Sequence, residues 1–165
     1  MTLDQLEQEP AVSDPADAAN REIDRRNAPL RTEIQLVRGG VGDASSFDRS
    51  LRESVLYVLR WSETELLTGD QDGVRWLYAF TSIRDLARYA AVRGADETAD
   101  VDFMTVRADR LLDAALPELA ASSGLPTGLA LDIGSTAPML VPSIPVAEAG
   151  AADNAAAAGD VDGAA

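Results

Sequence analysis

The sequence contains no cysteine, no histidine and no lysine, so all fourteen basic residues are arginine. Without cysteine there is no disulfide, no thiolate nucleophile and no cysteine-based zinc site. Without histidine the chain lacks the usual general base, the Ser-His-Asp triad and the commonest transition-metal ligand. Without lysine there is no Schiff-base chemistry and no phosphate-loop lysine. We therefore predict a protein that is not an enzyme and that binds no cofactor or metal, although carboxylate or Mg²⁺ chemistry stays open.

Aromatic residues are also scarce, at 5% of the chain, and alanine inflates the hydrophobic fraction of 46%. These values predict a small, mostly aliphatic core. The formal net charge is −14, and a field of this sign repels nucleic acid phosphates and anionic membrane surfaces. We therefore expect a protein partner, and neither a nucleic acid nor a membrane; the sequence leaves the oligomeric state open.

Long apolar runs are absent, because no stretch approaches the roughly 18 residues that a membrane span requires. The N-terminus lacks the basic segment followed by an apolar segment that marks a signal peptide. The expected location is the cytoplasm.

The length of 165 residues suits one domain with flexible ends. Residues 1–28 are predicted to be disordered and acidic, since the first 27 hold seven acids and three arginines without a sustained apolar period; a transient helix over 16–26 is compatible with this composition. Residues 143–165 are predicted to be a disordered Ala/Gly/Asp tail. The folded domain is expected over 29–142.

Two helices are predicted at the start of this domain. Pro29 suits the first turn of a helix that Gly39 and Gly40 end. The run Asp43 to Ser46 then offers N-caps for a second, short helix, with Ser45 or Ser46 as the preferred cap.

A hairpin followed by a helix is the most informative stretch of the chain. The continuous apolar run 55–59 predicts an interior strand. Short strand 65–68 and strand 74–80 follow, joined through the tight-turn pair Asp72-Gly73. A helix then begins at Thr81 or Ser82.

The C-terminal half continues the alternation with strand 101–106, helix 108–119 with Pro117 distorting its end, strand 128–133 and an edge strand 138–142. The fold class is α+β. We predict a single domain with a mixed or mostly antiparallel sheet of about five to six strands, covered by helices, with disordered termini.

Several motifs resemble a known bacterial family. They are VLYVL, the hairpin ELLTGDQDGVRWLYAFTS, DLARYAA, LLDAALPEL and GLALDIGSTAPMLVP. Together they cover about residues 44–142 and resemble the N-terminal domain of the SseB family, the enhanced serine sensitivity proteins, in its short actinobacterial form. The resemblance implies an α+β domain and implies no catalytic residues. Longer members carry a second domain, where this chain has its Ala/Gly/Asp tail.

The functional hypothesis is a non-enzymatic protein-binding or regulatory module. The candidate contact residues are Trp61, beside a turn, and the arginines Arg75, Arg84 and Arg88, which are interpreted as one anion-binding or partner-binding patch. Two alternatives stay open. One is a sensor of an amino-acid-related small molecule, or an enzyme built on carboxylates and arginine, and the other is an accessory protein of a secretion system.

Overall fold

A computed structural model describes residues 14–95 and 101–143 of the chain. Its elements, in chain order, are α1 (Pro15–Arg26), α2 (Ala28–Arg38), α3 (Ala44–Glu53), β1 (Val55–Leu59), β2 (Thr68–Gln71), β3 (Val74–Phe80), α4 (Ile83–Val92), β4 (Phe103–Arg107), α5 (Ala108–Arg110), the π-helical segment η1 (Leu111–Ala115), α6 (Leu116–Ser123), β5 (Thr127–Leu131) and β6 (Met139–Pro142).

One six-stranded sheet organises the domain, in the order β4-β1-β3-β5-β6, with β2 also paired to β3. β1 and β2 share one edge of β3: Tyr57 of β1 lies opposite Phe80, and Gly69 of β2 lies opposite Trp76. The pair β3–β5 is parallel and the other pairs are antiparallel. The predicted α+β fold with a mixed, mostly antiparallel sheet is confirmed.

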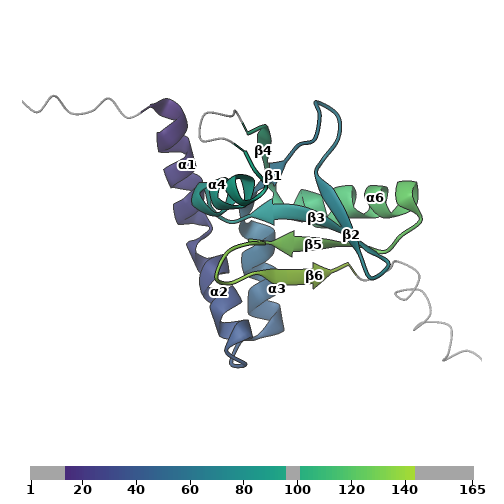
Figure 1. The fold of residues 1–165 in the computed structure, drawn as a ribbon. Helices are drawn as coiled ribbons and strands as arrows, with labels where there is room; N and C mark the ends of the chain where they lie inside the picture. The colour runs from purple at the N-terminus through teal and green to yellow at the C-terminus, as the bar shows by residue number, and fades with distance from the viewer. Residues whose placement is uncertain (1–13, 96–100, 144–165) are drawn as a thin grey trace, which may run out of the picture.

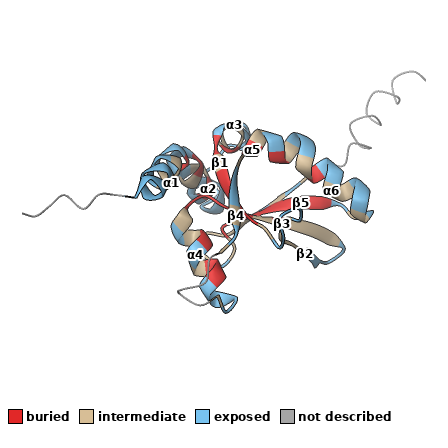
Figure 2. Ribbon diagram, turned by 90° about the horizontal axis from the view of Figure 1, so that it is seen from above, coloured by how far each residue is buried: buried red, intermediate tan, exposed pale blue. Residues whose placement is uncertain are grey.

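Helices cover both faces of this sheet (Figure 2). On one face, side chains of α2, α3 and η1–α6 pack on the sheet, among them Leu30, Leu51 and Leu111. Every core residue of this cluster is aliphatic, as the scarcity of aromatic residues predicts. No helix in the described part of the chain is long and apolar enough to cross a membrane.

The other face of the sheet carries the aromatic core. The ring of Tyr89 in α4 lies 5.3 Å from that of Phe80 and 5.6 Å from that of Tyr78. This confirms that the aromatic face of β3 packs against the following helix. Trp76 is only half-buried; its ring lies over Gly128, where a Cβ would come within 2.6 Å of Trp76 Cζ3.

The β2–β3 turn sets the position of β2. Asp72 and Gly73 both have positive φ, at 54° and 77°, as a two-residue hairpin turn requires. The turn pairs Gln71 with Val74, so that β2 begins at Thr68 and not at Glu65 as predicted. The sequence interpretation counted Gly69 to Gln71 as turn, although the turn needs only two residues.

The predicted disorder of residues 1–28 is wrong for Pro15–Arg26, which form α1 (Figure 1). Asp14 caps the helix by accepting from Ala16 N–H, and Pro15 occupies the first turn. The contacts that hold α1 are tertiary: Asp24 Oδ1 accepts from the Tyr57 hydroxyl and from Ile83 N–H. No local pattern encodes such contacts. The prediction is also wrong for Asn27, which is buried, and Ala28, which begins α2. At the start of the predicted tail, the Ser143 hydroxyl donates to the Thr127 carbonyl. The predicted disorder over 1–13 and 144–165 lies outside the described residues.

Two further local predictions need correction. Asp43, and not Ser45 or Ser46, caps α3, with its Oδ2 accepting from Ser46 N–H at 2.8 Å. Pro117 does not distort a helix end, because α6 continues to Ser123. The π-helical turn before it, closed by Leu116 N–H on the Leu111 carbonyl, widens the backbone where the proline ring would otherwise meet the carbonyl four residues earlier.

A buried asparagine joins the helical layer to the sheet. Asn27 lies between α1 and α2 and is fully buried. Its Nδ2 donates to the carbonyls of Val55, at 2.6 Å, and Thr81, at 2.9 Å, and its Oδ1 accepts from Val55 N–H at 3.0 Å. The Asn27 side chain is thereby hydrogen-bonded to backbone groups at the start of β1 and at the end of β3.

We predict that Asn27→Ala lowers the free energy of unfolding by about 3 kcal/mol, because it removes the partner of one buried and two half-buried backbone groups. Urea denaturation measures the change. Asn20→Ala is the matched control, since no side-chain hydrogen bond of Asn20 occurs in the described residues and alanine favours the helix. Equal stability of the two variants would contradict the role of Asn27.

Candidate functional site

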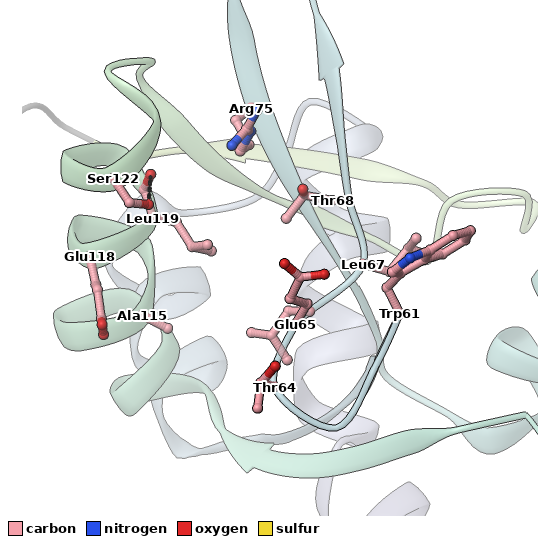
Figure 3. A pocket seen from close by; sticks show the side chains of 11 residues that line it. Trp61, Thr64, Glu65, Leu67, Thr68, Arg75, Ala115, Glu118, Leu119 and Ser122 are labelled. Atoms are coloured by element: carbon pink, nitrogen blue, oxygen red, sulfur yellow. Dashed lines mark hydrogen bonds between the residues drawn. The ribbon is translucent and has the colours of Figure 1, made fainter.

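An open groove of about 680 Å³ lies between the segment 61–68 and helix α6 (Figure 3). Trp61, Leu66 and Leu67 line one side, and Ala115, Glu118 and Leu119 line the other. Arg75 of β3 also lines it. The groove therefore holds two of the predicted contact residues, Trp61 and Arg75.

The loop between β1 and β2 presents Trp61 to solvent. Arg60 and Leu66 form an antiparallel bridge, and Trp61 N–H donates to the Glu65 carbonyl at 2.8 Å. These bonds close the loop at its base, and they leave the indole 76% exposed. Trp61 is therefore accessible to a partner, as a contact residue must be.

The groove is acidic in spite of Arg75. Arg75 makes two hydrogen bonds with Asp70, at 2.7 and 2.9 Å, and this guanidinium lowers the pKa of the Asp70 carboxyl. The positive charge of Arg75 is thus balanced by the Asp70 carboxylate. Glu65 and Glu118 form no ion pair among the described residues, so their two negative charges remain uncompensated.

A second site lies where the parallel strands β3 and β5 end. Thr81 follows β3 and Asp132 follows β5. Asp132 Oδ1 accepts from Thr81 N–H at 2.7 Å, and its Oδ2 accepts from the Thr81 hydroxyl at 2.8 Å. Asp132 is 4% exposed and has a φ of 50°, a conformation that aspartate adopts more readily than most residues.

Burial raises the pKa of the Asp132 carboxyl to about 6, against an ordinary value of 3.8. The two hydrogen bonds from Thr81 act in the opposite direction, nearby Asp85 adds to the rise, and Arg31 reduces it. Loss of water around the carboxylate therefore outweighs its hydrogen bonds. Asp132, Arg31 and Asp85 line a cavity of about 130 Å³.

Arg84 and Arg88 line a neighbouring open pocket of about 520 Å³, which they share with Arg31 and Asp85. Arg75 is not among its residues. Arg75 is the second residue of β3, whereas Arg84 follows the other end of that strand in α4. The predicted single patch of Arg75, Arg84 and Arg88 is therefore two separate sites.

The chemistry available at these sites is limited. The described residues contain no group of three or more acids that could hold a metal ion. An enzyme of the carboxylate–arginine type would need Arg75 or Arg84 in one pocket with an acid of raised pKa. Asp132 lines the smaller cavity and Arg84 the adjoining one, and none of the pockets identified holds both.

Sequence reasoning missed Asp132 and Arg31. Asp132 carries a visible signal, since it is a single acid between Leu131 and Ile133 in the otherwise apolar run 128–133. Arg31 carries none, because its role comes from contact with Thr81, 50 residues away in the chain. Comparisons with protein-family models, with curated proteins and with solved structures each found no match.

The raised pKa of Asp132 predicts a pH-dependent stability. The folded state binds this proton more tightly than the unfolded chain, so the resulting stability is fully present below about pH 4 and is lost as pH rises through about 6. The loss amounts to about 3 kcal/mol. Asp132→Asn removes the titrating group, so the stability of wild type relative to this variant should fall by that amount between pH 4 and 7.

Urea denaturation across this pH range measures the difference. Asp72→Asn, at an exposed turn position where asparagine accepts the same positive φ, controls for the loss of one negative charge. A difference between wild type and Asp132→Asn that does not change with pH would show that the carboxyl titrates as in the unfolded chain.

Proposed function

We propose that the protein is a non-enzymatic, SseB-like protein-binding or regulatory module that holds a segment of a partner protein in the groove beside Trp61. The observation that carries this proposal is an indole, 76% exposed, held by a closed loop at the edge of an open groove. A tryptophan buries roughly 150–250 Å² when it is covered. Aromatic anchors of this kind supply most of the binding energy at protein interfaces.

The walls of the groove indicate the chemistry of the partner segment. Its apolar residues, Leu66, Leu67 and Leu119, suit a large apolar side chain. Glu65 and Glu118 favour a basic residue next to that side chain, and the net charge of −14 attracts a basic partner over longer distances. We therefore propose a segment that combines an apolar anchor with arginine or lysine.

Two further elements belong to the proposal. The motifs that resemble the SseB family include Phe80-Thr81-Ser82 and Leu131 to Ser135, and Thr81 and Asp132 from these two motifs are hydrogen-bonded. This contact gives the two motifs a shared structural role. The proposed location is the cytoplasm, and nucleic acid is not a proposed partner.

We predict that Trp61→Ala weakens binding of the partner segment by about 30-fold or more, as for the loss of a central aromatic anchor. A peptide library of varied charge and apolar content, selected on the full chain, supplies the probe. Selected peptides should pair a basic residue with a large apolar one. Val92→Ala, at a 75% exposed position outside the groove, should leave the Kd within about two-fold of wild type.

Stability separates a binding effect from a folding effect. Both variants should unfold within about 0.5 kcal/mol of wild type, since both side chains are exposed. Glu65→Gln combined with Glu118→Gln should slow association and reduce its salt dependence. Selection of acidic peptides, or equal binding by wild type and Trp61→Ala, would contradict the proposal. A photo-reactive residue at Thr64, compared with one at Val92, then tests the same surface in host extracts.

A further inference from the structure

The pocket at the start of α4 concentrates positive charge in an acidic protein. Three of its lining residues are arginines, Arg31, Arg84 and Arg88, in a chain of net charge −14. Asp24 and Asp85 also line it, so its own five charged side chains leave one surplus positive charge. Asp132, with a pKa of about 6, lies in the adjoining cavity beside Arg31 and Asp85. This pocket is separate from the groove beside Trp61, which shares no lining residue with it.

The two aspartates of this pocket are already engaged with the protein. Asp24 Oδ1 accepts from the Tyr57 hydroxyl and from Ile83 N–H. Asp85 Oδ2 accepts from the Ser82 hydroxyl at 2.7 Å, and its Oδ1 accepts a long hydrogen bond, 3.4 Å, from Arg88. Both carboxylates therefore accept hydrogen bonds mainly from uncharged groups of the protein. Among the described residues, the one bond that an arginine of this pocket donates to them, from Arg88 to Asp85, is long.

The three arginines retain N–H groups that can donate hydrogen bonds to a ligand. Arg31 donates to the backbone carbonyls of Thr81, at 3.2 Å, and Asp24, at 2.8 Å, and pairs with no carboxylate in the described residues. Arg84 is exposed and forms no ion pair or side-chain hydrogen bond in residues 14–95 and 101–143. Since a guanidinium presents five N–H donors, most of the donors of Arg84 and several of those of Arg31 and Arg88 remain available.

Arg84 also carries a backbone donor without a protein partner among the described residues. In the first turn of α4, Ile83 N–H bonds to Asp24 and Asp85 N–H bonds to Ser82. Arg84 N–H, which lies between them, has no partner in the described part of the chain. The guanidinium and the backbone amide of one residue thus both lack a protein acceptor.

We propose that this pocket binds a small organic anion through a single carboxylate group, held by Arg84 and assisted by Arg31 and Arg88. Guanidinium groups match the planar geometry of a carboxylate with two parallel hydrogen bonds. A monoanion brings a single negative charge to the three guanidinium groups of the pocket. A phosphate dianion would carry excess negative charge next to Asp24 and Asp85 and is disfavoured for that reason.

Acetate is the probe for this site, as the smallest carboxylate. It is titrated into the ¹⁵N-labelled full chain at constant ionic strength and pH 7.5, with NMR spectra recorded for backbone N–H and arginine Nε–H groups. Arg84 N–H and the Nε–H groups of Arg31, Arg84 and Arg88 should shift with one saturable curve. Arg84→Gln should raise the apparent Kd about ten-fold, as expected for the loss of a charged hydrogen-bond donor.

Arg49→Gln is the matched control, because it removes the same charge at an exposed position of α3 outside this pocket; its Kd should stay within about two-fold of wild type. Trp61→Ala should also leave acetate binding unchanged, which separates this site from the groove. Saturation of the same signals by inorganic phosphate at lower concentration would overturn the carboxylate assignment. Shifts that do not saturate, or that Arg84→Gln leaves unchanged, would overturn the site.

Discussion

The fold depends on the hydrogen bonds of one buried residue, Thr81, which follows the end of β3. Its carbonyl accepts from Asn27 and Arg31, and its N–H and hydroxyl donate to Asp132. Thr81 itself is fully buried, so that any of these groups left unpaired would cost the free energy of a lost hydrogen bond without water to replace it. The helices before the sheet, the central strand and strand β5 therefore all converge on Thr81.

The burial of Thr81 also explains why the cavity beside it is lined by the buried carboxyl group of Asp132, whereas the groove beside Trp61 is open to solvent. At the Thr81 end of β3, polar groups are buried among partners, and the pKa of Asp132 rises because water is excluded. At the other end, Arg75 and Asp70 form an ion pair at the surface, and exposed pairs of this kind add little to stability. The loop that carries Trp61 is closed by its own backbone bonds and is joined to Asp102 through Arg60. The buried hydrogen bonds that hold the fold together lie at the Thr81 end of β3. The exposed Trp61 lies near the other end, where no such buried bonds among the described residues constrain it.

Local patterns predicted much of this structure, where the physical cause is local. The turn at Asp72-Gly73 follows from positive φ, and the cap at Ser82 follows from its spacing to Asp85. The interior position of β1 follows from an apolar run on both faces. Local reasoning was wrong for α1, whose hydrogen bonds through Asp24 reach β1 and α4. It was also wrong in grouping Arg75 with Arg84 and Arg88, because closeness in sequence concealed the length of β3 between them.

The sequence by itself determined the fold class and the chemistry that is excluded. Side-chain types and their periods decide which elements form, and the missing cysteine, histidine and lysine remove whole classes of catalysis. Only the tertiary structure decided which residues share a site. Trp61 and Glu118 of α6 line one groove, Arg84 and Arg31 line one pocket, and Thr81 is hydrogen-bonded to Asp132. These partners are about 50 residues apart in the chain, and only the pairing of β3 with β5 and the packing of helices on both faces bring them together.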